Sequence, residues 1–182
     1  MRHTALTLAI LLTSFAAPPN QAAPPEPAAK AAAPVLNAQD VKLVIGDAKK
    51  LDAMLAAHKG RVVFVDYWAT WCGPCVEFFP HTVELSRKFK DQGLAVIAVS
   101  FDAADSPQVV REFLARHGAE FENLISSHDL GPAAFEDFKI DLVPNFRLYD
   151  RQGKLRHKWD AKPTDAEEKI KELLAEKQSQ SP

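Results

Sequence analysis

The chain has little cysteine and no excess of charge of either sign, and both shortages exclude classes of protein. Only two of its 182 residues are cysteines, which excludes the disulfide framework typical of small secreted domains. Lysine and arginine total 22 against 24 aspartates and glutamates, so no basic field is available to hold a nucleic-acid backbone. We therefore expect no nucleic-acid partner. With 47% hydrophobic residues, the chain has enough apolar sequence for one compact domain.

The N-terminal apolar stretch lacks the length of a membrane-spanning helix. Arg2 and His3 precede an apolar run over residues 5–17, an order typical of a secretory signal peptide. Because a spanning helix needs about 20 apolar residues, we expect cleavage after Ala16 or near residues 22–23. The protein would then be periplasmic or otherwise extracytoplasmic, and an uncleaved segment would leave it tethered to the membrane. No cysteine lies near either position, which excludes a lipid-modified N-terminal cysteine.

Composition divides the chain into three parts. Residues 1–23 are the predicted signal peptide, and residues 24–40 are rich in alanine and proline, which predicts a linker. Residues 41–178 alternate strand and helix patterns, which predicts one α/β domain. The expected order is βαβαβα, a loop or short helix, and then ββα.

Local signals define most of these elements. Short apolar runs predict strands at residues 41–45, 62–65 and 94–99, and alternation over residues 146–159 predicts an antiparallel hairpin. Ser106 followed by Pro107 predicts a helix start with a capping side chain. Thr164 and Glu167 predict a capping box at the last helix.

The two cysteines lie three positions apart in the run Trp71-Cys72-Gly73-Pro74-Cys75, where a buried strand passes into a helix. Such a short loop gains little stability from a disulfide, so a structural role explains the pair poorly. A helix N-terminus stabilises a thiolate, and we therefore expect Cys72 to react with external sulfur. Cys75, one turn into the helix and less exposed, would resolve the mixed disulfide. Half of a zinc site is the alternative, but two of six scattered histidines would have to complete it.

The segment from Asp66 to Cys75 resembles the active-site segment of thioredoxin. The additional residues at about 102–141, together with the leader and linker, are similar to the TlpA/ResA-type subgroup of extracytoplasmic thioredoxin-like proteins. This resemblance covers residues 41–177. It implies a thioredoxin-like α/β fold, in which helices flank a central mixed β-sheet and an insertion precedes the cis-proline strand. The subgroup often has asparagine in place of Asp66, and Pro-Pro or Glu-Pro between the cysteines.

The resemblance also assigns an acid and a helix kink. Asp66, six positions before Cys72, would assist proton transfer to Cys75. An acid within an apolar strand is expected to have a raised pKa, which suits that role. A purely structural hydrogen-bonding role for Asp66 is the alternative. Pro80, five positions after Cys75, would kink the active-site helix.

A substrate surface follows from the same resemblance. The Val143–Pro144 bond would be cis, with the backbone of Val143 pairing with an extended substrate and Pro144 shielding the cysteines. Asn145 stands where the family commonly has threonine. We expect Trp68 in the core. Further substrate contacts are expected from the residues at and between the cysteines: Trp71, Gly73 and Pro74.

The Gly73-Pro74 dipeptide resembles that of strongly reducing thioredoxins. The resemblance thus implies a monomeric protein-disulfide reductase that needs no cofactor and no metal. Because the periplasm is kept oxidising, such a reductase implies a membrane thiol-transfer partner as electron donor. Two alternatives remain: an oxidase or isomerase of exported proteins, and a copper-binding protein on the same fold. The copper-binding proteins usually have three residues between their cysteines, and this chain has two.

Overall fold

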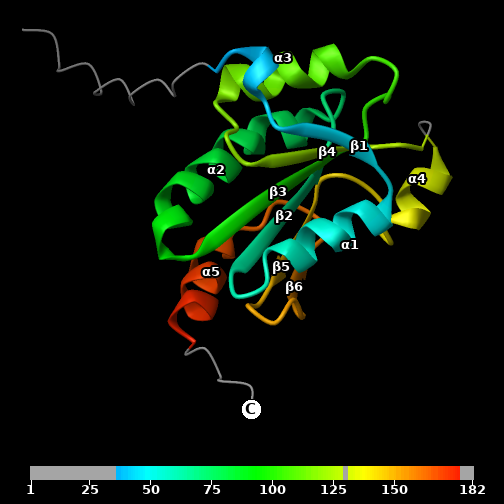
Figure 1. Ribbon diagram of the computed structural model, residues 1–182. Coiled ribbons are helices and arrows are strands. Elements are labelled where there is room, and N and C mark those ends of the chain that lie inside the picture. The colour runs from blue at the N-terminus through cyan, green and yellow to red at the C-terminus, as the bar shows by residue number, and fades with distance from the viewer. Residues whose placement is uncertain (1–35, 129–130, 177–182) are drawn as a thin grey trace, which may run out of the picture. The chain divides into compact units, whose positions relative to one another are not determined.

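Two fully buried strands form the centre of the sheet in the computed structural model, which describes residues 36–128 and 131–176 (Figure 1). Every residue of β2 (Val62–Trp68) and β3 (Leu94–Ser100) is buried. Uninterrupted apolar runs of this kind are typical of parallel strands covered on both faces. The two strands pair in parallel, with Asp66 opposite Ala98.

Four further strands extend this pair into a mixed sheet. Within the described ranges the strand order is β1-β4-β3-β2-β5-β6. β1 (Leu43–Gly46) and β4 (Glu122–Ser126) continue the parallel side, whereas β5 (Asn145–Tyr149) and β6 (Leu155–Trp159) form the antiparallel side. The predicted fold class, a mixed sheet flanked by helices, and the predicted hairpin are confirmed.

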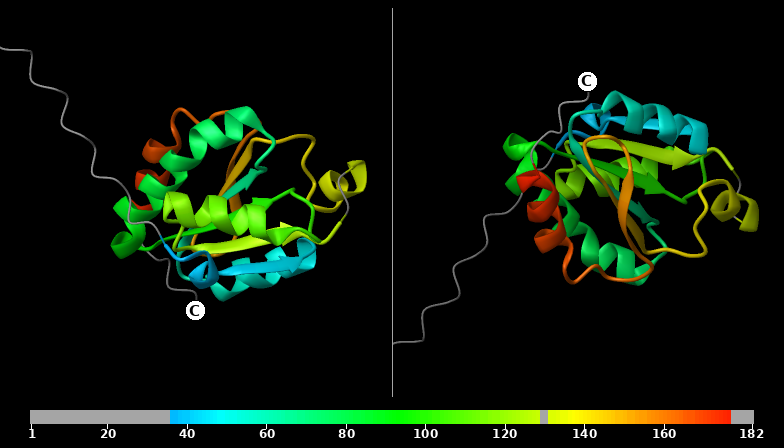
Figure 2. Two further views of the ribbon diagram at one scale, coloured as in Figure 1. Left: turned by 90° about the horizontal axis from the view of Figure 1, so that it is seen from above. Right: turned by 90° about the horizontal axis from the view of Figure 1, so that it is seen from below.

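Helices cover both faces of the sheet. In Figure 2 (right), α1 (Ala48–Ala57) lies on one side of the sheet, and α2 (Gly73–Phe89) and α5 (Ala166–Ala175) lie on the other. α3 (Pro107–His117) joins the α2 side, because Phe79 of α2 and Phe113 of α3 both pack 4.6 Å from the ring of Trp68. The shorter helices are η1 (Ala38–Asp40), η2 (Lys90–Gln92) and α4 (Pro132–Asp137).

The core on the α2 side is aromatic. Phe64 of β2 stacks on Phe146 of β5 at 5.7 Å, and Phe78 of α2 meets Phe146 edge to face at 5.0 Å. All three side chains are buried. Full burial of such a ring contributes about 1.5–3 kcal/mol relative to exposure. These contacts fix the angle at which α2 crosses β2, and therefore position the cysteines at the start of α2.

Two capping predictions are wrong. Ser106 stands at the N-cap of α3, but its side chain makes no capping hydrogen bond. α5 begins after Asp165 and has no capping box at Thr164 and Glu167. The carboxylate of Glu167 is engaged elsewhere, since it accepts hydrogen bonds from the ammonium groups of Lys88 at 2.7 Å and Lys171 at 2.6 Å.

Two further predictions from the sequence are wrong: strand β4 was not predicted, and the folded domain begins before residue 41. β4 was expected to be a loop or short helix. Leu36 and η1 fall within the predicted linker, yet the amide of Leu36 donates to the carbonyl of Ala115 at 3.0 Å, and Ala38 packs against the core. The predicted signal peptide, linker residues 24–35 and the last two residues of the predicted domain lie outside the described residues. Within residues 36–128 and 131–176, no helix combines the length and apolarity needed to cross a bilayer.

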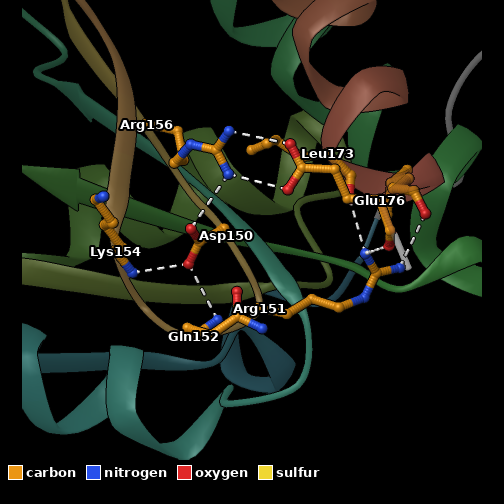
Figure 3. A network of polar contacts seen from close by, with 8 residues as sticks. Asp150, Arg151, Gln152, Lys154, Arg156, Leu173 and Glu176 are labelled. Atoms are coloured by element: carbon orange, nitrogen blue, oxygen red, sulfur yellow. Dashed lines mark hydrogen bonds and ion pairs between the residues drawn. The ribbon is translucent and has the colours of Figure 1, made fainter. Parts of the chain in front are cut away.

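The turn between β5 and β6 is fastened to the end of α5 (Figure 3). The guanidinium of Arg151 donates to three terminal carbonyls of the helix segment, those of Leu173 at 2.7 Å, Leu174 at 3.1 Å and Glu176 at 3.2 Å. The last carbonyls of a helix lack intrahelical partners, so Arg151 acts as their cap. Buried Asp150 accepts hydrogen bonds from backbone amides of the same turn, at Gln152 and Lys154.

Candidate active site

The two cysteines form a disulfide at the point where β2 gives way to α2. The Cys72–Cys75 bond is 1.99 Å long and its Cα atoms lie 5.2 Å apart. Cys72 is the N-cap residue of α2, and its sulfur accepts a hydrogen bond from the amide of Cys75 at 3.3 Å. Backbone amides and the helix dipole at this position favour negative charge on sulfur. The geometry thus supplies the thiolate-stabilising environment expected at Cys72.

The cysteines differ less in exposure than the sequence suggests. In the disulfide form Cys72 is 7% exposed and Cys75 is 3% exposed, so both count as buried. Access comes from the flanking residues: Trp71 is 55% exposed, and Gly73 and Pro74 are also exposed. A partner can therefore approach the disulfide over the exposed flanking residues from the Cys72 side. Trp68, by contrast, is buried, as expected for a core residue.

Asp66 is a buried acid in the centre of β2. It is 2% exposed, and its Oδ2 atom accepts a hydrogen bond from the hydroxyl of Thr82 at 2.6 Å. Burial raises the pKa of Asp66 to about 7, and the Thr82 hydrogen bond opposes that rise. A carboxyl with this pKa exchanges protons at neutral pH, which is the property a general acid or base requires.

The Val143–Pro144 peptide bond is cis, and it precedes β5. Pro144 lines a cavity of about 350 Å³ together with Pro74, which lies between the cysteines. The cavity is also lined by residues of α2, the loop before β5 and the β6–α5 connection: Glu77, Phe78, Leu142, Asp160, Ala161 and Lys162. The structure thereby brings Pro74 and Pro144 together, and it places an apolar hollow beside the disulfide.

The loop before the cysteines is held by the end of β3. A carboxylate oxygen of Asp102 accepts a hydrogen bond from the amide of Thr70 at 3.0 Å, and the other accepts from the Thr70 hydroxyl. The indole nitrogen of Trp71 donates to the carbonyl of Phe101 at 3.3 Å. Asp102 is itself fixed by a 2.6 Å hydrogen bond from the hydroxyl of Ser100. These contacts set the position of Trp71 relative to Cys72.

Several residues of this site were missed by sequence reasoning. Thr82 occupies a buried position within the apolar stripe of α2, and a polar residue there was a usable signal. Asp102 gave no local signal for a role at the site, because its partner Thr70 is about thirty residues away in sequence. The cavity residues come from α2 and from two loops that are distant in sequence. Among the described residues, no group of three or more His, Cys, Asp or Glu side chains is arranged to hold a metal ion.

In this protein a central strand of a mixed sheet leads into a cysteine pair, and a cis-proline loop lines the same cavity as the residues between the cysteines. These features together define the thioredoxin-like class of proteins. Comparison with protein families narrows this class. The Redoxin family model matches residues 30–174, and the chain belongs to that family as a thioredoxin-like protein of the TlpA/ResA type.

Relatives and solved structures agree with this assignment. The thiol-disulfide oxidoreductase ResA of Bacillus thuringiensis (strain Al Hakam) is 32% identical over 109 residues, which cover 60% of this chain and 59% of that protein. ResA of Bacillus thuringiensis subsp. konkukian is 30% identical over 128 residues, covering 70% of this chain and 69% of the relative. The chain therefore spans only about three fifths to two thirds of the length of these relatives.

Solved structures share the fold. A Chlorobium tepidum protein provisionally assigned as the thiol:disulfide interchange protein DsbE is 30% identical, with a TM-score of 0.54 over 66% of this chain and 82% of that one. A thiol-disulfide isomerase of Corynebacterium glutamicum has a TM-score of 0.58 at 21% identity, covering 66% of this chain and 85% of its own. At that identity, the second comparison supports the fold alone.

Proposed function

We propose that this protein reduces disulfide bonds of extracytoplasmic proteins by dithiol exchange through Cys72 and Cys75. The observation that carries the proposal is the disulfide itself, because it lies at a helix N-terminus beside an open cavity and no other cysteine exists in the chain. Relatives named as thiol-disulfide oxidoreductases support the same chemistry.

The first step is attack by the Cys72 thiolate on one sulfur of a substrate disulfide. A bond forms between Cys72 and that sulfur, the substrate disulfide breaks, and the second substrate sulfur leaves as a thiolate that takes up a proton. The amide of Cys75, 3.3 Å from the Cys72 sulfur, stabilises the attacking thiolate.

The second step resolves the mixed disulfide. The Asp66 carboxylate accepts the proton of the Cys75 thiol, and the resulting thiolate attacks the sulfur of Cys72. The remaining substrate sulfur leaves and is protonated, so two electrons have passed from the dithiol to the substrate. The product is the Cys72–Cys75 disulfide seen in this structure. A pKa of about 7 at Asp66 suits both the acceptance and the later release of the proton.

The substrate would bind as an extended segment over the cis-proline loop. In this proposal the backbone of Val143 pairs with the segment, while Trp71, Gly73, Pro74 and Pro144 contact residues next to its cysteine. The cavity beside Pro74 and Pro144 offers room for one apolar side chain of that segment. These contacts would involve the backbone of the substrate and only one of its side chains. Such contacts depend little on substrate sequence, so they suit a protein that acts on several unfolded or extended substrates.

Repeated turnover requires a reductant, because each cycle leaves Cys72 and Cys75 oxidised. We assign this role to a membrane thiol-transfer protein that delivers two electrons through its own dithiol, and we place the monomeric domain outside the cytoplasm, behind a signal peptide at residues 1–23. The order of Arg2 and His3 followed by an apolar run over residues 5–17 supports this location.

Insulin reduction with single cysteine variants tests the mechanism. Cys72→Ser should abolish turnover. Cys75→Ser should still attack the substrate but should accumulate a mixed disulfide through Cys72, visible by mass spectrometry and useful for capturing native substrates. The double variant contains no thiol and serves as the control. Full turnover by both single variants would refute the mechanism.

The direction of electron flow is tested by the redox potential of the Cys72–Cys75 pair. A reductase should equilibrate near the thioredoxin value of about −270 mV, and an oxidase near the DsbA value of about −120 mV. A glutathione titration followed by tryptophan fluorescence separates these values. A potential near that of DsbA would assign the protein to the oxidation of exported proteins.

A further inference from the structure

We propose that Thr82 is a positioning residue for the proton-transfer step, holding the Asp66 carboxyl group in the geometry and charge state that accept the Cys75 proton. The inference rests on the proposed function, because it concerns the resolution of the mixed disulfide. It also adds a residue that the sequence motif around the cysteines does not contain.

The contact between Thr82 and Asp66 is short and buried. The Thr82 hydroxyl is 2.6 Å from Oδ2 of Asp66, within the range of a hydrogen bond to an ionised oxygen. Thr82 is fully buried at 0% exposure. The Thr82 hydroxyl binds Oδ2 of Asp66, so this hydrogen bond fixes one of the two carboxylate oxygens.

Thr82 and Cys75 share one side of α2. They are seven positions apart, close to two helical turns, so both side chains project from α2 toward β2. Both are buried. The same helix thus presents the thiol that loses the proton and the hydroxyl that orients its acceptor. The buried hydroxyl of a threonine in this position would otherwise bond the preceding turn of its own helix.

Among the described residues, Thr82 is the hydrogen-bonding side chain next to Asp66, because the residues that pair with Asp66 in the sheet are apolar. The strand partners of Asp66 are Ala98 on β3 and Phe146 on β5, which are both apolar. On α2 and α3, His81 lies against the ring of Phe78, and His117 against the ring of Phe79.

Charged groups on the neighbouring elements have other partners: the ammonium of Lys162, in the β6–α5 connection, lies over the ring of Phe78, 5.9 Å from its centre. Arg147 of β5 lies over the ring of Tyr67, on the opposite face of the sheet, with its guanidinium carbon 5.1 Å from the ring centre. α5 contributes apolar Ala166, Ile170 and Leu173 to the core on the α2 side. Among the buried residues of α2, Cys75 is the one that titrates when it is reduced. Burial raises the pKa of Asp66 and the Thr82 hydroxyl lowers it, which leaves the carboxyl half ionised near neutral pH.

Removal of the hydroxyl should therefore shift the pH dependence of one kinetic step. Thr82→Val preserves the shape of the side chain and removes the donor. With one hydrogen bond lost, we expect the pH midpoint of the resolving step to rise by about one unit, and its rate at pH 7 to fall about fivefold. Thr82→Ser keeps a hydroxyl and should restore the wild-type midpoint.

The test uses reduced full-length protein mixed with 5,5′-dithiobis(2-nitrobenzoate) in a stopped-flow instrument. Attack by Cys72 releases one thionitrobenzoate, and attack by Cys75 on the mixed disulfide releases the second, so the two steps are separate absorbance phases. Thr82→Val should slow the second phase and leave the first unchanged. Ser86→Ala removes a hydroxyl from the same helix at a half-buried position and serves as the matched control.

The outcomes distinguish this inference from the proposed function. The role of Thr82 would be overturned if the pH midpoint of the second phase were unchanged in both Thr82→Val and Thr82→Ala but displaced in Asp66→Asn. That result would leave dithiol exchange intact. The absence of a second phase in the wild-type protein would overturn the proposed function itself. In an Asp66→Asn background, Thr82→Val should produce no further shift, because the group it acts through is gone. Thr82→Ala also replaces Thr82→Val if the valine variant does not fold.

Discussion

The amide nitrogen of Thr70 lies 3.0 Å from a carboxylate oxygen of Asp102, and this hydrogen bond joins the loop before the cysteines to the end of strand β3. The Thr70 hydroxyl binds the same carboxylate, which is itself 8% exposed. Two chain segments about thirty residues apart are thus fixed to each other one position before Trp71. The position of the exposed Trp71 ring follows from this contact.

Asp102→Asn should loosen that loop, because an amide offers one acceptor oxygen where the carboxylate offers two. We expect a loss of about 1–3 kcal/mol in the free energy of unfolding, the range for hydrogen bonds to charged groups and for buried polar groups left unpaired. Urea denaturation followed by tryptophan fluorescence measures the loss. Asp105→Asn, at an exposed position three residues later, is the control. Equal stability of the two variants would contradict the anchoring role of Asp102.

The stability of the oxidised protein should fall as pH rises through neutrality, because of Asp66. Burial raises the pKa of Asp66 from 3.8 to about 7, so the folded state holds a proton that the unfolded state releases. Stability from this group is complete below about pH 4 and is lost as pH rises toward 7. At about 1.4 kcal/mol per pH unit, the total loss is about 4 kcal/mol by pH 8.

Urea unfolding of wild type and Asp66→Asn at pH 5 and pH 8 checks this expectation. The wild type should be distinctly less stable at pH 8, whereas the asparagine variant should lose much less stability between the two conditions. Asp141→Asn, at an exposed position, should keep the wild-type dependence. Identical pH dependence in wild type and Asp66→Asn would show that Asp66 is ionised throughout this range.

A substitution in the cavity beside the disulfide should weaken the binding of protein substrates more than that of small disulfides. Leu142 is 49% exposed and lines the cavity, so Leu142→Ala removes apolar surface available to a substrate side chain. We expect the KM for insulin to rise about three- to tenfold, the effect of losing about 1 kcal/mol of apolar contact, with kcat little changed. Leu155→Ala is a matched control, since Leu155 is 42% exposed and lies on β6 outside the cavity. The rate with a small aromatic disulfide should be unaffected in both variants. A comparable loss with that small disulfide would point to damage at the cysteines instead.

Arg151 should contribute to stability through hydrogen-bond geometry in addition to charge. Its guanidinium reaches three carbonyls at the end of α5, which a lysine ammonium cannot bind in the same arrangement. Arg151→Lys should therefore lower the free energy of unfolding by about 1–2 kcal/mol, measured by thermal and urea denaturation. Arg116→Lys, at an exposed position on α3, should change it by less than about 0.5 kcal/mol. A similar small change in both variants would remove Arg151 from the contacts that hold α5.

The parts of the fold that sequence predicted are those with strong local signals. β2 and β3 are buried on both faces, so their apolar runs needed no knowledge of their neighbours. Pro74 and Pro107 mark first helical turns, and both stand there. The role of the cysteine pair could be predicted for the same reason, because a strand precedes it and a helix begins at it.

The parts that sequence missed depend on contacts between distant segments. β4 contains Glu122 and Asn123, which obscure a strand pattern, and it is a strand because it pairs with β1 and β3. Glu167 pairs with lysines, and one of these belongs to another helix, which no local capping signal anticipates. The partners of Asp66 and Thr70 are likewise set by packing, which brings Thr82 and Asp102 to them from distant parts of the chain.

The register of β2 with β5 has a consequence for the order in which the chain assembles. Asp66 pairs with β3 on one side and with β5 on the other. β3 follows Asp66 closely in the sequence, whereas Phe146 of β5 is synthesised much later. Until β5 and α5 have docked, one flank of Asp66 faces water and its carboxyl behaves as an ordinary ionised side chain. The cysteine motif is therefore synthesised early, while the buried acid that serves it acquires its raised pKa only when β5 and α5, which lie beyond residue 144, have folded against it.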